Sequence, residues 1–232
     1  MLKARLAVAV LAGLVSACAP PIREQAPVEK RSPADFPEAY YREAAAQGKP
    51  VFRVDPDASL VVIEVRRAGS LARLGHDHVV ASHDVEGYVA PEDGRADFYV
   101  QLERLVVDEP ALRAEAGFDT QPSEADIAGT RGNMLDRVLE AGQFPFALIH
   151  VGGVAARERG VRLTVAITLH GTTLMLQVPA QIETDAGEMS VTGHLAFDQT
   201  DFGISPFSIL GGAIQVQDRV DLRFKIRARR IG

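Results

Sequence analysis

Histidines are the residues of this chain whose type and spacing are best suited to chemistry. The sequence contains six histidines, and two of them, His76 and His78, flank one aspartate in Gly75–His78 (GHDH). On a strand these two side chains point to the same face, where two imidazoles can bind a transition metal. The same pair can instead hydrogen-bond the polar head group of a bound molecule.

Strand periodicity does not bring the other histidines to the same place. His83 shares the inward parity of Val85. It therefore opposes the pair His76 and His78 unless the strand bends between them. His170 lies near a strand end, where a polar side chain is typical of a turn. Three interpretations stay open: a metal site, contacts with a ligand head group, or polar residues at the mouth of the fold. The residues concerned are His76, His78, His83 and His170.

Motifs that suggest catalysis are incomplete in this sequence. The contiguous residues Ser82–Asp84 (SHD) cannot form a catalytic triad, because triad side chains converge from separate elements. The tripeptide Asp201–Gly203 (DFG) matches a kinase motif, but its partner motifs are missing, and no glycine-rich phosphate loop precedes a helix. We therefore expect a binding protein without catalytic residues, and a turn in which Gly203 adopts a positive φ.

The elements that must position these residues are strands, because apolar residues alternate with polar ones over much of the chain. Each such strand has one apolar and one polar face. Consecutive antiparallel strands of this kind predict a barrel or a sandwich. The alternating segments cover residues 61–65, 98–102, 161–169, 174–182, 189–197 and 220–226. Strands are predicted in the first half over Val51–Val54, Leu60–Arg67, His78–Val89 and Ala96–Val107.

The apolar faces of these strands predict an interior that either encloses a hydrophobic ligand or is filled by its own side chains. The chain has no Trp and few aromatic residues, so aliphatic side chains would form most of the wall. The residues predicted to line the interior are Val61, Ile63, Val65, Phe98, Val100, Leu102, Val165, Ile167, Leu176, Val178, Leu195, Phe197, Leu222 and Phe224.

Two helices are expected among the strands. A short one is predicted over Glu38–Gln47, ended by Gly48 and Pro50. The other begins after Ser123, which suits a helix cap, and ends before Gly142. As the single helix inside the strand-rich domain, it is expected to plug or cap one end of a barrel.

The N-terminus predicts export and attachment to a membrane. Residues 1–17 combine a basic start, a short apolar run and a small-residue cleavage site, as in a secretory signal peptide. Cys18 follows directly and resembles the lipidated cysteine of bacterial lipoproteins; the alternative is an ordinary signal peptide with an incidental cysteine. Residues 18–48 are then a lipidated cysteine, a proline-rich unpacked tether to Pro33 and the short helix, followed by a barrel domain over 49–232.

Composition limits the partners. The formal net charge is −6 and becomes more negative when the signal peptide with Lys3 and Arg5 is removed, which argues against nucleic acid. Cys18 is the only cysteine, so stability must come from burial and not from an internal disulfide. The expected partners are a hydrophobic small molecule and a membrane, and a homodimer stays open.

Three segments together resemble the YceI-like domain. They are Gly142–Pro145 (GQFP), Leu169–Thr173 (LHGTT) and Phe197–Ile204 (FDQTDFGI), and the order and spacing match over residues 49–230. Two features depart from the usual pattern. Asp198–Thr200 stands where the family often has an arginine, and Gly75–His78 is typical of a subgroup.

This resemblance implies a fold and a ligand that the periodicity does not. The fold is all-β, a lipocalin-like antiparallel eight-stranded β-barrel with one capping helix. The ligand is a polyisoprenoid lipid, such as a quinone or a prenyl phosphate, and no other cofactor is expected. The expected function is a periplasmic lipid-binding protein, tethered on the outer-membrane side because Ala19 and not Asp follows Cys18. The alternative is a histidine-rich accessory protein associated with a metal or haem.

Overall fold

The structure is a computed structural model that describes residues 28–231. The predicted signal peptide and Cys18 lie outside the described residues. Within the described part, no helix is both long and apolar enough to cross a membrane.

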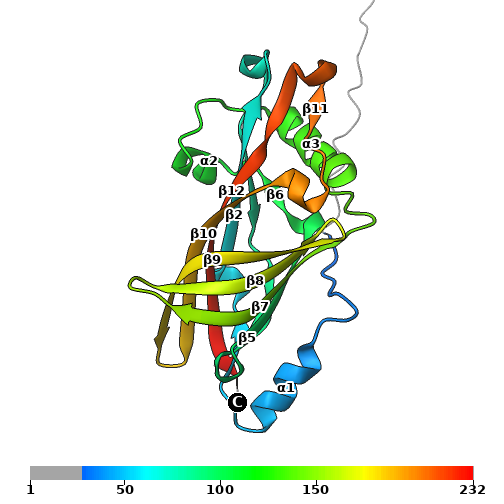
Figure 1. Ribbon diagram of the computed structural model, residues 1–232. Helices are drawn as coiled ribbons and strands as arrows, with labels where there is room; N and C mark the ends of the chain where they lie inside the picture. The colour runs from blue at the N-terminus through cyan, green and yellow to red at the C-terminus, as the bar shows by residue number, and fades with distance from the viewer. Residues whose placement is uncertain (1–27, 232) are drawn as a thin grey trace, which may run out of the picture.

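The strands form one antiparallel sheet that closes on itself (Figure 1). The ring runs β1-β4-β5-β7-β8-β9-β10-β12 and closes where β12 pairs with β1. This is an all-β, lipocalin-like barrel of eight strands, as predicted. The bounds are β1 Val51–Val54, β2 Leu60–Ala68, β3 His78–Ser82, β4 Val85–Ala90, β5 Arg95–Gln101, β6 Val106–Val107, β7 Phe146–Ala156, β8 Val161–Leu169, β9 Thr172–Asp185, β10 Glu188–Asp198, β11 Ser208–Ile209 and β12 Ile214–Ile231.

The long strand β12 joins the barrel to an extension at one end. Its last residues pair with β1, and residues 215–225 pair with β2. The strand β2 then continues the sheet to β3 and β6. Figure 1 shows β12, β2 and β11 rising beyond the barrel toward the top of the view.

The strand predicted over His78–Val89 is broken in the middle. It ends as β3 at Ser82 and resumes as β4 at Val85. Val80 and Val85 both pack in the same interior cluster although five positions separate them, so the in-and-out parity changes at the break. A local irregularity of this kind re-aims the side chains that follow it.

Two helices cover the outside of the barrel. The predicted first helix is present as α1, Glu38–Ala46, where Tyr41 and Ala44 pack against Val51, Tyr88 and Ala90. A second helix, α2 at Pro110–Glu115, was not predicted from the sequence. It packs Leu112 over outward-facing apolar residues of β2 and β3, namely Val62, Val79 and Ala81. The outward faces of β2 and β3 are therefore covered by α2 at these residues and are not exposed to solvent.

The predicted capping helix is α3, Glu124–Asn133, continued by a π-helical turn at Met134–Val138. Ser123 and Asp126 form a reciprocal capping box at its start. Leu135 is buried in the interior cluster, and Ile127, Met134 and Leu139 pack against the same cluster. The helix thus covers one end of the barrel.

Part of the predicted tether is packed on the barrel, which corrects the sequence analysis. The backbone N–H of Arg31 donates to Gln101 Oε1 at 3.0 Å, and Gln101 Nε2 donates to the carbonyl of Glu29 at 3.1 Å. Lys30 Nζ lies 3.0 Å from Asp84 Oδ1. An unpacked tether up to Pro33 is therefore wrong for residues 28–33, because the side-chain amide of Gln101 binds their backbone.

Candidate functional site

The predicted wall residues line the barrel interior from several strands. Across β2 and β12, Val61 pairs with Phe224 and Ile63 with Leu222, so these side chains share a face. Val65, Phe197 and Leu222 are placed inward by the same registers. The remaining wall residues belong to or pack against the two interior clusters, namely Val61, Ile63, Phe98, Val100, Leu102, Val165, Ile167, Leu176, Val178, Leu195 and Phe224.

Most of this wall is not close-packed. Val100, Leu102, Val165 and Val178 are buried. The other wall residues keep partial access to solvent although their side chains face other strands across the barrel. They are Val61, Ile63, Val65, Phe98, Ile167, Leu176, Leu195, Phe197, Leu222 and Phe224. A filled core would bury these side chains, whereas here they stay partly accessible to solvent.

The end of the barrel away from α3 is filled by small and branched side chains. Ala96, Val151, Leu163, Val178 and Ala180 are all buried in one cluster there. The accessible part of the wall therefore lies toward α3, and the interior is closed at the other end by its own side chains.

Two glycines allow aromatic rings to lie flat against the wall. A Cβ built on Gly193 would lie 2.6 Å from the Phe224 ring, and one built on Gly87 would lie 2.6 Å from the Phe98 ring. Carbon atoms do not approach so closely. Glycine at both positions therefore keeps the rings against the wall and out of the interior.

At the α3 end, His78 is oriented by a buried carboxylate. Its Nδ1 lies 2.6 Å from Asp108 Oδ2, and the Asp108 side chain is fully buried. Asp108 also accepts from the backbone N–H of Val79 at 3.0 Å and from Arg113 Nη1 at 2.6 Å. Burial opposes ionisation, but the hydrogen bonds from His78, Val79 and Arg113 hold the pKa of Asp108 below its usual range. Nδ1 of His78 then carries a proton, and Nε2 is free to contact a ligand.

His76 adds a second buried ring nitrogen at this end of the barrel. Its ring centroid lies 6.2 Å from that of His78, and its Nδ1 has no hydrogen-bond partner among the described residues. Asp77, between them, is held by the backbone N–H of Arg67 at 2.8 Å. Hydrogen bonds from Ser123 lower the pKa of Asp126 at the start of α3, and His76 and His78 lie close enough to influence the same carboxylate. The histidine pair therefore lies close to the start of the capping helix.

The structure separates the other predicted histidines from this pair. His78 shares the face of Val65, its partner on β2. His83, beyond the break after Ser82, lies outside, with Nε2 2.8 Å from Glu109 Oε2. The predicted inward parity of His83 is thus wrong. His150 and His194 are outward residues of β7 and β10.

His170 has a structural position in the turn between β8 and β9. It adopts a φ of 51° and Gly171 a φ of 73°, as a two-residue hairpin turn requires. Its Nε2 lies 2.8 Å from Glu140 Oε2, and its ring lies 4.7 Å from that of Phe144. Gly203 has a φ of 72°, as predicted, close to the same turn. Segments from all three motifs of the resemblance therefore meet at this end of the barrel.

Within residues 28–231, no group of three or more His, Cys, Asp or Glu side chains is arranged to hold a metal ion. The pair His76 and His78 lacks a third ligand there, since Asp108 is already bound to His78 and Arg113. Sequence analysis missed Asp108 and Arg113, which belong to the unpredicted α2 region.

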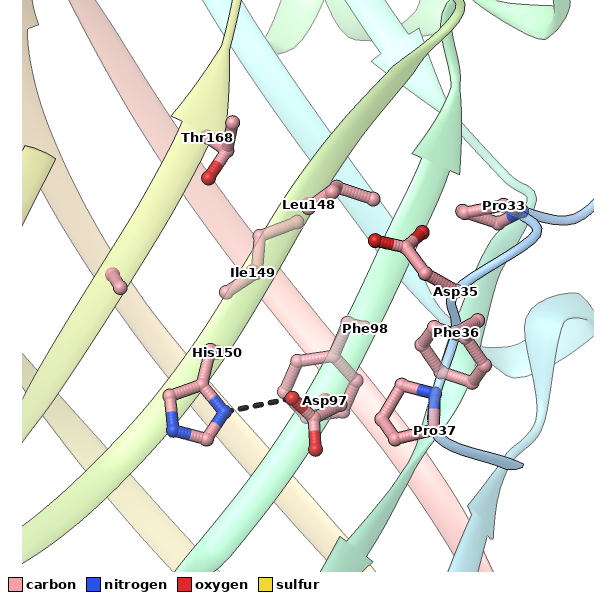
Figure 2. A pocket seen from close by; sticks show the side chains of 11 residues that line it. Pro33, Asp35, Phe36, Pro37, Asp97, Phe98, Leu148, Ile149, His150 and Thr168 are labelled. Atoms are coloured by element: carbon pink, nitrogen blue, oxygen red, sulfur yellow. Dashed lines mark hydrogen bonds and ion pairs between the residues drawn. The ribbon is translucent and has the colours of Figure 1, made fainter. Parts of the chain in front are cut away.

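A separate pocket lies outside the barrel wall (Figure 2). Its volume is about 190 Å³, and it lies between residues 33–37 and strands β5, β7 and β8. Asp97 accepts from Tyr41 Oη at 2.6 Å and lies 2.7 Å from His150 Nδ1. Burial opposes ionisation of Asp97, but hydrogen bonds from Tyr41, Arg95 and His150 lower its pKa. The pocket is smaller than usual ligand sites of about 300–1,000 Å³, and its polar network anchors α1 to the barrel.

A closed antiparallel barrel with an accessible aliphatic interior defines a class of small-molecule-binding folds. The YceI-like domain matches residues 52–228, so the chain belongs to the YceI-like domain family. No curated protein matches the chain.

Two solved structures are similar in fold. One is BcnA from Burkholderia cenocepacia, at 14% identity and a TM-score of 0.53, covering 75% of this chain and 98% of that one. The other is a polyisoprenoid-binding domain from Saccharophagus degradans implicated in plant cell wall breakdown, at 14% identity and a TM-score of 0.54, covering 78% and 98%.

Proposed function

We propose that this chain is a periplasmic, membrane-tethered protein that binds a polyisoprenoid-type lipid inside its barrel. The observation that carries this proposal is the inner wall, whose aliphatic side chains face one another yet keep access to solvent. A prenyl chain buried against such a wall gains roughly 25 cal/mol per Å² of apolar surface. The family and the polyisoprenoid-binding domain of similar fold support this ligand class.

The polar end of the lipid belongs near His76 and His78. Nε2 of His78 and Nδ1 of His76 offer hydrogen bonds at the α3 end, while the opposite end is filled by apolar residues. Two cations at this end are already paired, Arg113 with Asp108 and Arg67 with Asp77 and Asp119. An uncharged quinone-type head group, which needs only hydrogen bonds, therefore fits the histidine pair better than a prenyl phosphate, whose charge would lie near the Asp126 carboxylate.

Membrane attachment is proposed from Cys18 and its preceding signal-like segment. We expect Cys18→Ser to move the protein from the membrane to the soluble periplasmic fraction while the barrel stays folded. The measurement is fractionation of cells followed by immunoblotting. Continued association of the variant with membranes, at wild-type levels, would show that lipidation is not the anchor.

The lipid is tested by native mass spectrometry after mild extraction, followed by binding assays with a long-chain quinone and with a polyprenyl phosphate. A co-purifying prenyl lipid, and tighter binding of the quinone, are expected. A barrel that is empty and rejects both lipids would overturn the proposal. Tighter binding of the phosphate would keep the lipid class but contradict the assigned head group.

The metal- or haem-associated alternative rests on the His76 nitrogen beside His78, which has no hydrogen-bond partner within residues 28–231. Elemental analysis and an absorption spectrum of the purified protein distinguish it from lipid binding. Stoichiometric metal or haem that is lost in His76→Ala and His78→Ala variants would favour this alternative. Absence of bound metal and haem, also after addition of zinc or copper, would exclude this alternative.

A further inference from the structure

Two turns meet at the far end of the extension formed by β2 and β12. One covers residues 69–75 and the other residues 209–213. The backbone N–H of Leu71 donates to the carbonyl of Ala213 at 2.8 Å, and the position of Gly75 lies against the Ile214 side chain. Figure 1 shows both turns at the top of the molecule, beyond α3. We call these two turns the tip.

The tip exposes large apolar side chains. Leu74 is 60% exposed and Leu210 is 70% exposed, and Ile209 beside it is also exposed. Leu210 has a φ of 53°, a backbone conformation that is unfavourable for a leucine. Turns usually carry Gly, Asn or Asp at such a position. Neither packing nor turn geometry within the protein accounts for leucine here.

The tip carries positive charge and no negative charge. Residues 69–75 and 209–213 contain no acidic residue, and their one charged side chain is Arg73. Arg73 is exposed and forms no ion pair among residues 28–231. Exposed leucines beside a free arginine match a phospholipid surface, where apolar side chains enter the interface and cations meet anionic head groups.

The tip is also connected to the element that covers the barrel. Phe207, just before the second turn, lies under the Arg137 guanidinium at 5.2 Å. Arg137 belongs to the π-helical turn that continues α3, and Leu135 of that turn is buried in the barrel interior. Any surface to which the tip binds is therefore close to the end of the barrel that α3 covers. This is the end where the lipid head group is proposed to bind.

We infer that the tip docks onto a phospholipid bilayer through Leu74, Ile209 and Leu210, and so brings the α3 end of the barrel to the membrane surface. This inference rests on the proposed lipid-binding function for its purpose, but docking is measured independently of lipid uptake.

The test is sedimentation with vesicles of equal parts phosphatidylethanolamine and phosphatidylglycerol. It uses the full chain with Cys18→Ser, so that the lipid anchor does not contribute. The tip variant is Leu74→Ser with Leu210→Ser. The matched control is Met175→Ser with Val154→Ser, because Met175 is 66% and Val154 51% exposed on the barrel strands, outside the tip. We expect the tip variant to lose at least about tenfold in vesicle partitioning and the control to be unchanged.

The outcomes separate docking from the proposed function. Equal vesicle binding by the tip variant and the control would overturn the docking inference. A change in sedimentation velocity without vesicles, confined to the tip variant, would assign the tip to contact between two copies and also overturn it. Quinone binding in detergent is measured for both variants: loss of vesicle binding with quinone binding retained supports the inference. A protein that docks but binds no quinone would overturn only the proposed function.

Discussion

At the scale of single residues, Asp108 organises the polar end of the barrel. It is fully buried between His78 and Arg113, and it adopts a φ of 59° at the entry to α2. A carboxylate in this position sets which nitrogen of His78 faces the interior. The orientation of His78 in the GHDH segment thus depends on a residue thirty positions later in the chain.

We expect Asp108→Asn to destabilise the protein by about 3–5 kcal/mol, because the buried Arg113 loses its counter-charge. Urea unfolding followed by circular dichroism measures this change. The control is Asp119→Asn, whose carboxylate is 72% exposed in its ion pair with Arg67; its cost should be below about 1 kcal/mol. Equal effects of the two substitutions would contradict the buried role of Asp108.

A second residue-scale prediction concerns the wall. Ile167 is inward and partly accessible, so Ile167→Asp should leave the barrel folded and weaken quinone binding, because water can reach the carboxylate. In a filled core the same change would cost several kcal/mol and unfold the domain. The control, Thr168→Asp on the outward face, should cost under about 0.5 kcal/mol. If the control is as damaging as Ile167→Asp, the assignment of inward and outward faces is wrong.

At the scale of elements, glycines decide where strands and rings approach each other. Gly193 on β10 lies against the Phe224 ring and the carbonyl of Pro179 on the two neighbouring strands. In contrast, Gly129 in α3 has no atom within 4 Å of an added Cβ. The same substitution is therefore expected to act in opposite directions at these two positions.

We expect Gly193→Ala to destabilise the barrel by about 1–3 kcal/mol, since the backbone carbonyl of Pro179 cannot move far. Gly129→Ala should stabilise it by about 0.5–1 kcal/mol through helix propensity. Thermal unfolding of both variants measures the difference. A neutral Gly193→Ala would mean that β9 and β10 are further apart than the structure shows.

At the scale of the whole molecule, buried carboxylates tie separate segments to the barrel. Asp97 holds Tyr41 of α1 and His150 of β7, and Asp108 holds Arg113 of α2 and His78 of β3. Each carboxylate therefore joins an outer helix to a strand of the sheet. The stability of the molecule therefore depends on the ionised form of both groups.

This dependence predicts loss of stability in acid. The pKa values of Asp97 and Asp108 are lowered from an ordinary 3.8 in the folded state. A lowered folded pKa gives stability that is fully present above the unfolded pKa and is lost as the pH falls through the folded value. The urea midpoint should thus be insensitive to these groups near neutrality and fall below about pH 4. Asp97→Asn should reduce this acid dependence; an unchanged profile would contradict the role of Asp97.

The barrel walls, the capping helix and the family follow from the amino-acid sequence. Strand alternation depends on which residues are neighbours in the chain, and the Ser123 cap and the turn at Gly203 are equally local. The resemblance carried by Gly142–Pro145 and two later segments supplied the closed lipocalin-like fold. These segments proved to be parts of one end of the barrel.

The surroundings of the site follow only from the tertiary structure. The break after Ser82 reversed the parity expected for His83, because its effect depends on how two strand pieces pair with different neighbours. The helix α2, the buried Asp108 and the binding of residues 28–33 by Gln101 likewise come from contacts between segments far apart in sequence. Periodicity records only which face a side chain takes within one strand, whereas burial and charge pairing depend on what other segments place against that face.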